Sequence, residues 1–344
     1  MTVQEEPQDL LRVRNLSMSF ALSKGFLGRV HSTVDANADV SFTVKESETL
    51  SVVGESGCGK TTLGRCIVGM YRPTGGSVEF RGEDGRFVDL VPLSTAEMKP
   101  YRSQIRMIFQ DPFSSLNPRM SVLELIGEPL RIQRGMSGRP LEDRVVELLE
   151  RVGLPGSYAQ RYPHAFSGGE RQRIGIARAL ALNPRLVVAD ECVSALDVSI
   201  QAQVLNLLGE IQKEFGIAYL FISHDLTVVR HISDRVAVMY AGTLVELADV
   251  KALFDRPMHP YTQALLSAAP RPVPGARGKS RRIRLEGEVA DLANKPSGCL
   301  FHPRCRHARD RCKVDAPALR AMPDGRTVAC HFAEEIAQTP ASDV

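Results

Sequence analysis

The octet Gly54–Thr61 (GESGCGKT) constrains the fold of this 344-residue chain more than any other feature. An apolar run at 49–53, suited to a buried parallel strand, comes directly before it. A stretch with helical spacing follows, and it places Leu63, Ile67 and Met70 on one face. Strand, glycine-rich loop and helix in this order are typical of a phosphate-binding loop, because the glycines let backbone N–H groups converge on an anion at the positive end of the helix. The sequence therefore predicts a nucleoside triphosphate site in an α/β fold.

Two side chains of this loop suit a triphosphate with its Mg²⁺. Lys60 would supply a positive charge to the β- and γ-phosphates, and Thr61 would offer its hydroxyl to Mg²⁺. The expected ATP-binding residues of this segment are Gly54, Glu55, Ser56, Gly57, Cys58, Gly59, Lys60, Thr61 and Thr62.

Composition excludes several classes of protein. The 43 basic and 40 acidic residues give a net charge of +3, too small to indicate a nucleic-acid partner. The first ten residues are acidic and lack the apolar core of a signal peptide, and no run of about 18 apolar residues could span a bilayer. A membrane role would therefore require docking onto another subunit.

Strand and helix patterns alternate along the chain. Apolar runs predict strands at 11–20, 40–44, 50–53, 77–81, 105–109, 186–189 and 217–222, and a hairpin at 236–246. Helical spacing predicts helices at 121–130, 141–152, 171–182 and 198–215, the last begun by Asp197 and ended by Gly216. We therefore expect a mostly parallel, helix-covered sheet, with a helical insertion between about 112 and 168.

Two carboxylates close the apolar strand that ends at Ala189. Asp190 would hold Mg²⁺ at the carboxyl edge of the sheet, and Glu191 is the candidate for polarising the attacking water. A second glycine pair, Gly168-Gly169 after Ser167, stands before a helix and predicts another anion site. Two phosphate sites in one chain suggest head-to-tail pairing with a like subunit.

In this set of motifs the chain resembles the ATP-binding-cassette family over roughly residues 10–270. Ser167-Gly168-Gly169 stands at the family's signature motif, Gln110 at the Q-loop, 194–197 with Asp197 at the D-loop, His224 at the switch histidine, and Phe20 where an aromatic stacks on adenine. The resemblance implies a P-loop NTPase core with an antiparallel β subdomain. It also implies catalytic roles for Lys60, Glu191 and His224, with Mg²⁺ held by Thr61, Asp190 and Gln110.

Besides Thr61, which replaces a frequent serine and is chemically equivalent for Mg²⁺, two positions depart from the family pattern. Glu170 replaces the usual Gln after the signature glycines, where its carboxylate would lie near an incoming triphosphate and weaken that site. Cys192 replaces the usual proline after the catalytic glutamate, which would relax the backbone next to Glu191. Neither change removes an essential group, so we expect an active ATPase.

Segments outside these motifs are similar to the ATPases of dipeptide and oligopeptide importers. They are 115–119 (SLNPR), 161–164 (RYPH), 259–266 (HPYTQALL) and the tail 298–330. The resemblance implies an F-type second ATPase subunit that drives a membrane importer. The alternatives are an importer of nickel or another small solute, and a soluble non-transport ATPase.

The same resemblance implies the partners, location and domains. The expected partners are a paralogous ATPase subunit, or a second copy of the chain, and two transmembrane permease subunits, with an extracytoplasmic solute-binding protein acting indirectly. The expected location is the cytoplasmic face of the plasma (inner) membrane. The expected domains are a nucleotide-binding domain at 8–270, and a linker with a C-terminal extension at 271–344.

The C-terminal extension carries four of the seven cysteines: Cys299, Cys305, Cys312 and Cys330. Their spacing is not that of paired zinc-ribbon thiols. Four thiolates suit a [4Fe–4S] cluster or Zn²⁺, and some members of the importer family carry an iron–sulfur cluster here. Free thiols in a small folded tail are the third interpretation.

Overall fold

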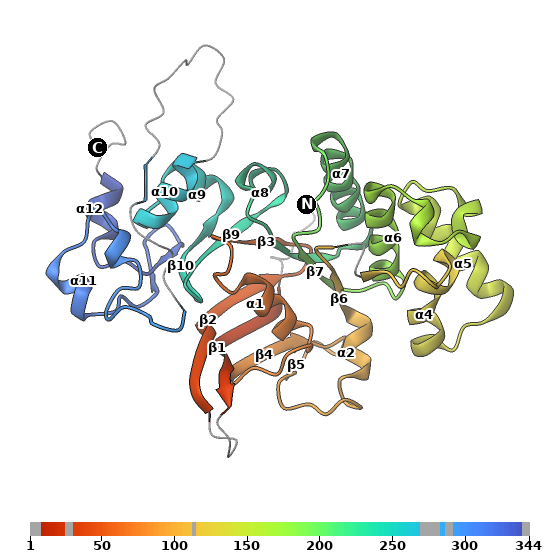
Figure 1. The fold of residues 1–344 in the computed structure, drawn as a ribbon, viewed down its shortest axis with the longest axis horizontal. Helices are drawn as coiled ribbons and strands as arrows, with labels where there is room; N and C mark the ends of the chain where they lie inside the picture. The colour runs from red at the N-terminus through yellow and green to blue at the C-terminus, as the bar shows by residue number, and fades with distance from the viewer. Residues whose placement is uncertain (1–7, 25–29, 112–114, 269–282, 286–291, 339–344) are drawn as a thin grey trace, which may run out of the picture. The chain divides into compact units, whose positions relative to one another are not determined.

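The computed structural model describes residues 8–24, 30–111, 115–268, 283–285 and 292–338 (Figure 1). The chain forms two compact units that alternate along the sequence. The first comprises 1–10, 44–48 and 92–222, and the second 11–43, 49–91 and 223–344. Most of the predicted linker falls in 269–282, outside the described residues.

Three parallel strands form the centre of the first unit. β6 (Ile105–Ile108) pairs with β7 (Leu186–Asp190), which pairs with β8 (Ala218–Ile222). Every residue of β7 and β8 is buried, as their apolar sequences predict. In sequence, helix α7 (Val198–Phe215) lies between β7 and β8, and its predicted bounds and caps are confirmed. The Asp197 side chain accepts a hydrogen bond from the N–H of Ile200, and Gly216 ends the helix at φ 66°.

Helices form much of the remaining described part of the first unit. They are α2 (Lys99–Gln104), α4 (Val122–Arg134), α5 (Gly138–Arg151) and α6 (Gly168–Leu180), with 3₁₀ turns at 156–160 and 163–165. α4, α5 and α6 gather beside one another (Figure 1). They bury apolar positions at helical spacing, including Leu125, Val145 and Ile174. The helices predicted at 121–130 and 141–152 are thus confirmed, with their ends shifted by a few residues.

An antiparallel sheet forms one part of the second unit. Its strands lie in the order β2 (Val30–Lys45), β1 (Asp9–Lys24), β4 (Gly75–Arg81), β5 (Phe87–Asp89). Leu11 lies opposite Phe80 and Val13 opposite Val78, and all four side chains are buried. Alternating burial along β4 is typical of a sheet with one covered face. The predicted antiparallel β subdomain is therefore confirmed.

The other part of the second unit carries the phosphate-binding loop. β3 (Thr49–Val53) runs parallel to β9 (Arg235–Tyr240), which forms the predicted hairpin with β10 (Thr243–Asp249). The C-terminal segment adds β12 (Thr327–Val328) to β10, and β11 (Arg320–Ala321) to β12. The helices of this part are α1 (Lys60–Ile67), α8 (Leu226–Ile232), α9 (Val250–Asp255), α10 (Pro260–Ala268), α11 (Asp310–Val314) and α12 (Ala333–Gln338).

One helix is shorter than the sequence predicts. α1 ends at Ile67, and Gly69 follows with φ 71°. Leu63 and Ile67 are buried as expected, whereas Met70 lies beyond the helix and is 53% exposed. Placing Met70 on the same helix face as Leu63 and Ile67 was wrong, because α1 ends before Met70 and the left-handed Gly69 turns the chain.

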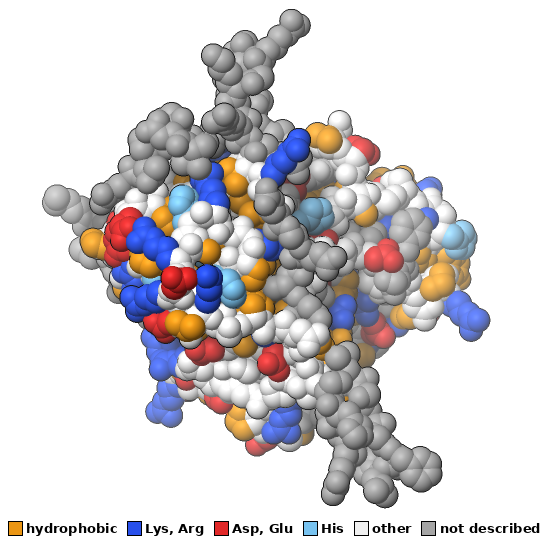
Figure 2. Space-filling view, turned by 60° about the vertical axis from the view of Figure 1, so that its left-hand side comes forward, with side chains coloured by type: hydrophobic (Ala, Val, Ile, Leu, Met, Phe, Trp, Pro, Cys, Tyr) orange, Lys and Arg blue, Asp and Glu red, His pale blue; other side chains and the backbone are white. Residues whose placement is uncertain are grey.

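The C-terminal segment is packed into the second unit through an aromatic cluster. The ring of Phe301 lies 5.2 Å from that of Tyr240 and 5.5 Å from that of Tyr261, measured between centroids. All three side chains are at most 2% exposed. On the face that Figure 2 brings forward, acidic and basic side chains are interspersed. The C-terminal segment also contains ion pairs such as Arg311–Asp315.

None of the helices in the described part of the chain is both long enough and apolar enough to cross a membrane.

Candidate nucleotide-binding site

The phosphate-binding loop turns tightly between β3 and α1. Gly59 is the residue before the helix and has φ 99°, a left-handed conformation that favours glycine. A Cβ there would lie 2.1 Å from the carbonyl oxygen of Ala36, and one on Gly54 would lie 2.3 Å from that of Met239. No side chain caps the N-terminus of α1. No capping side chain therefore competes with a ligand for the backbone N–H groups at the start of this helix.

Lys60 is folded into the loop. It is 4% exposed, and its Nζ donates hydrogen bonds to the carbonyl oxygens of Gly54 at 2.8 Å and Glu55 at 2.9 Å. An ammonium group removed from water needs such acceptors. A phosphate group would offer stronger, charged acceptors for the same protons. This geometry suits a lysine that exchanges its carbonyl acceptors for the phosphate oxygens of a bound anion.

The predicted carboxylates lie at the carboxyl end of β7 in the first unit. Asp190 is 2% exposed. Glu191 has φ 43°, which is unusual for a residue with a Cβ, and its N–H donates to the carbonyl of Ile222 at 2.9 Å. The carbonyl of Glu191 accepts hydrogen bonds from the N–H and hydroxyl of Ser194. Such backbone conformations persist where surrounding bonds enforce them, and they are concentrated at functional sites.

Gln110 and Glu191 are brought together although 81 residues separate them in sequence. The Nε2 of Gln110 donates a hydrogen bond to Oε2 of Glu191 at 2.8 Å. Gln110 follows β6 and Glu191 follows β7, and the two strands are parallel neighbours, so both side chains arise at one edge. This edge is where open α/β sheets bind their ligands.

The signature segment has a more specific structure than predicted. Ser167 is the N-cap of α6, and Gly168 and Gly169 lie in its first turn rather than before it. The Glu170 carboxylate accepts hydrogen bonds from the N–H and the hydroxyl of Ser167, at 2.9 and 2.8 Å, while its own N–H donates back to that hydroxyl. This is a capping box. The bonds from Ser167 lower the pKa of Glu170.

The capping box gives the Glu170 carboxylate a role that the sequence-based expectation of a charge near an incoming triphosphate did not include. In this structure the carboxylate turns back to cap its own helix. The sequence contained the signal for this cap, since a serine three residues before a glutamate is its usual pattern.

The remaining expected residues divide between the two units. Phe20, Thr61, Thr62 and His224 belong to the second unit, together with the phosphate-binding loop. Phe20 is 36% exposed and meets Tyr71 edge to face at 5.5 Å, and His224 is exposed directly before the N-cap of α8. Gln110, the signature residues, Asp190, Glu191 and Asp197 belong to the first unit.

Known proteins that are similar to this chain belong to the same family that its motifs resemble. The ABC transporter family matches residues 38–194, and the family described as oligopeptide/dipeptide transporter, C-terminal region, matches residues 245–312. The oligopeptide transport ATP-binding protein AppF of Bacillus subtilis (strain 168) is 51% identical over 328 residues, 94% of this chain and 98% of the relative. The chain belongs to the ATP-binding-cassette (ABC) family.

Two further comparisons agree. The di/tripeptide transport ATP-binding protein DppF of Pseudomonas aeruginosa (strain UCBPP-PA14) is 44% identical over 328 residues, 95% of this chain and 99% of the relative. The ATP-binding cassette MJ0796, solved as a dimer in a post-hydrolysis state with ADP and Pi, is 28% identical. It covers 70% of this chain and 99% of its own, with a TM-score of 0.62. The chain is thus an ABC transporter ATPase with the family's mainly parallel α/β fold, as predicted.

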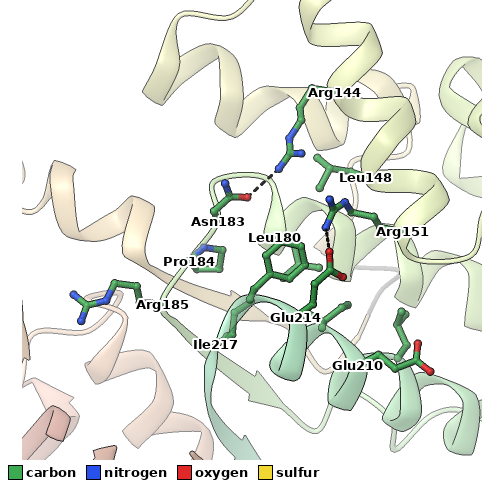
Figure 3. Close-up of a pocket in the computed structure, with 13 residues that line it drawn as sticks. Arg144, Leu148, Arg151, Leu180, Asn183, Pro184, Arg185, Glu210, Glu214 and Ile217 are labelled. Atoms are coloured by element: carbon green, nitrogen blue, oxygen red, sulfur yellow. Dashed lines mark hydrogen bonds and ion pairs between the residues drawn. The ribbon is translucent and has the colours of Figure 1, made fainter. Parts of the chain in front are cut away.

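The ABC ATPase has a further cavity, which does not belong to the nucleotide motifs. Figure 3 shows this space of about 240 Å³ in the first unit, with Leu180, Pro184 and Ile217 in its wall. Arg144 reaches Asn183 across its rim, and Arg151 reaches Glu214. Pro184 and Arg185 lie just before β7 and Ile217 just before β8, whereas Asp190 ends β7 about 13 Å further on. The cavity therefore lies at the opposite end of β7 from the predicted catalytic carboxylates.

The four C-terminal cysteines of this ABC ATPase line one small cavity. Its volume is about 10 Å³, and His259, His302, His307 and His331 also contribute to its wall. Burial raises the pKa of Cys305 to about 12 and that of Cys330 to about 11. Among the residues that the structure describes, no group of three or more His, Cys, Asp and Glu side chains is placed to hold a metal ion. The described side chains are therefore not arranged for either the [4Fe–4S] cluster or the zinc alternative.

Proposed function

We propose that this ABC ATPase supplies the energy for import of dipeptides or oligopeptides across a membrane. The names of the relatives support this cargo, since proteins for oligopeptide and di/tripeptide transport match 94–95% of the chain. The match over residues 245–312 supports it independently, because this segment lies outside the nucleotide motifs. As a working division, we keep a nucleotide-binding domain at 8–270, with a helical part at 112–168, and an extension at 271–344.

The proposed reaction is transfer of the γ-phosphoryl group of ATP to water. Lys60 would neutralise the phosphates, Thr61 and Asp190 would hold Mg²⁺ with the help of Gln110, and Glu191 would accept a proton from water. His224 would contact the γ-phosphate, and Phe20 would stack on adenine. The hydrogen bond between Gln110 and Glu191 carries this proposal, because it joins a predicted metal ligand to the predicted base.

Two subunits would share each ATP. Ser167, Gly168 and Gly169, with Asp197 nearby, would complete the phosphate site of a partner cassette, either a paralogous ATPase or a second copy. The dimeric state of the solved cassette supports this arrangement. ATP would favour the closed pair over the open one, and this difference in affinity is the work available to two membrane permease subunits. The chain would then lie at the cytoplasmic face of the inner membrane and receive cargo indirectly from a solute-binding protein.

Replacing the proposed base tests the catalytic assignment. Glu191→Gln should lower ATP turnover by roughly 10²- to 10⁴-fold, because the amide cannot accept the proton, and ATP affinity should stay within about twofold. The measurements are phosphate release and equilibrium ATP binding. Glu210→Gln is the matched control, because it is the same substitution at a residue that lines the separate cavity. Wild-type turnover in Glu191→Gln would show that another group is the base.

We also propose that Cys299, Cys305, Cys312 and Cys330 hold a [4Fe–4S] cluster. The convergence of four thiols on one cavity supports a sulfur-rich site, although the 10 Å³ space requires these side chains to move apart around a cluster. A bound cluster would supply a cross-link or a one-electron redox centre. The test is the content of iron and acid-labile sulfide in protein purified without oxygen. Iron-free protein would contradict this proposal and leave the ATPase assignment intact.

A further inference from the structure

A two-point ion pair joins the C-terminal segment to the phosphate-binding loop. Nη1 of Arg304 donates to Oε2 of Glu55 at 2.7 Å, and Nη2 donates to Oε1 at 3.0 Å. The two residues are 249 positions apart in sequence and belong to the same compact unit. The Arg304 side chain is 7% exposed and that of Glu55 is 25% exposed. A forked, poorly hydrated pair of this kind is strong and fixes direction as well as distance.

Arg304 is held in place by the cysteine-bearing segment. It lies between Cys299 and Cys305, in a turn where the N–H of Arg304 donates to the carbonyl of Phe301 and the N–H of Cys305 donates to that of His302. The Arg304 guanidinium lies 5.9 Å from the ring centre of Tyr240, beside the aromatic cluster. The position of the guanidinium therefore follows the fold of this turn.

Glu55 is bound at each of its polar groups. Its N–H donates to the hydroxyl of Tyr261 at 2.9 Å, its carbonyl accepts from Lys60, and its carboxylate binds Arg304. Tyr261 is fully buried, and burial raises the pKa of its hydroxyl, which stays protonated. Arg304 thus fixes the residue whose backbone holds the phosphate-binding lysine.

We propose that Arg304 is a positioning residue for the phosphate-binding loop, through which the C-terminal segment sets the loop's affinity for ATP. The inference rests on the proposed role of Gly54–Thr61 in binding phosphates. Two physical effects act in the same direction. The pair restrains the loop around Lys60, and it neutralises a carboxylate that would otherwise repel a triphosphate. No residue of the C-terminal segment needs to touch ATP for this effect.

The test is equilibrium titration of the full chain with ATP, together with KM and kcat for hydrolysis. Arg304→Met removes the fork and leaves the Glu55 charge unpaired, so ATP affinity should fall on the order of tenfold. KM should rise by the same factor, and kcat should change less, because Arg304 does not contact the reacting atoms. Arg304→Lys keeps the charge without the fork and should recover part of the affinity.

The C-terminal segment offers a matched control. Arg320 makes a forked pair with Glu334 inside this segment, and its other hydrogen bonds go to Met322 and Cys330 of the same segment. Arg320→Met should leave ATP affinity unchanged, and melting temperatures of all variants show whether they fold. If Arg304→Met does not fold, Arg304→Lys decides the matter. It keeps the positive charge beside Glu55 but loses the fork, and affinity should fall by about two- to fivefold.

Two results would overturn the inference. One is ATP affinity within twofold of wild type in folded Arg304→Met, or in Arg304→Lys if the former does not fold. The other is an equal loss in Arg320→Met, which would indicate general loosening of the segment. Lys60→Ala separates this inference from the assignment of the site. If that variant binds ATP normally, the loop is not the nucleotide site, whereas if only Lys60→Ala loses binding, the role of Arg304 alone is wrong.

Discussion

The two glycine-containing helix starts, at α1 and α6, were both predicted as anion sites, but they are built differently. At α1 the residue before the helix is left-handed Gly59, and no side chain caps the first turn. At α6 the residue before the helix is Ser167 in an extended conformation, and a complete capping box with Glu170 closes the first turn. The first turn of α1 has no capping side chain, whereas Ser167 and Glu170 already supply hydrogen-bond acceptors at the start of α6.

The glycines at the two sites accordingly meet different requirements. Gly59 is needed by the loop itself, since its backbone conformation and its contact with Ala36 both exclude a Cβ. Gly168 has no left-handed conformation, and the nearest atom to an added Cβ is a side-chain carbon of Leu196 at 4.0 Å. Among the described residues, no atom lies close enough to an added Cβ to demand glycine at 168. An open surface there is useful only to something that approaches from outside, which suits the proposed contact with a partner's nucleotide.

Exchanging each glycine for alanine tests this difference and carries the largest expected effect. Gly59→Ala places a methyl group 2.1 Å from a backbone oxygen, so the loop must shift by about an ångström. A misplacement of this size can cost roughly 10² in turnover. ATP affinity of the isolated subunit should also fall. Gly168→Ala should leave ATP affinity of the isolated subunit unchanged, as measured by titration below the dimerisation concentration.

Hydrolysis by the assembled pair sharpens the same comparison. If Gly168 faces a partner's phosphates, Gly168→Ala should lower turnover in the dimer while binding to the single subunit stays normal. Melting temperatures serve as the control for folding. Normal ATP binding by Gly59→Ala, or weakened binding by the isolated Gly168→Ala subunit, would show that the two helix starts do not differ as described.

Sequence rules predicted the parts of the fold that depend on neighbouring residues. Helix α7 begins and ends where Asp197 and Gly216 place it, because capping acts within one turn. The hairpin of β9 and β10 likewise follows from two alternating runs separated by Ala241-Gly242. The phosphate-binding loop was recognisable for the same reason, since its function lies in eight consecutive residues.

Contacts between distant segments were not predictable in this way. Nothing in the local sequence pairs Gln110 with Glu191, or Arg304 with Glu55, because parallel pairing and tail packing bring them together. The left-handed backbone of Glu191 is similar, since bonds to Ile222 and Ser194 enforce it against local preference. The Glu170 cap differs from these distant contacts, because its pattern lies within the four consecutive residues from Ser167 to Glu170 and could be predicted from them.

The capping box gives the smallest expected effect and a distinct pH signature. Hydrogen bonds from the Ser167 N–H and hydroxyl lower the pKa of Glu170 below its usual 4.5. The folded-state pKa therefore lies below that of the unfolded chain. The charged carboxylate stabilises the fold fully above pH 4.5, and this contribution is lost as pH falls through the folded-state pKa. Glu170→Gln keeps an acceptor for the cap but does not titrate.

The quantity to measure is the difference in melting temperature between wild type and Glu170→Gln, from pH 7 to well below pH 4.5. All other groups titrate in both proteins, so this difference isolates Glu170. Wild type should lose stability relative to the variant as the solution becomes more acidic. A difference that does not change with pH would mean that the carboxylate is not held by Ser167 in solution. The α6 start would then be as open as that of α1, and the contrast between the two sites would rest on glycine geometry alone.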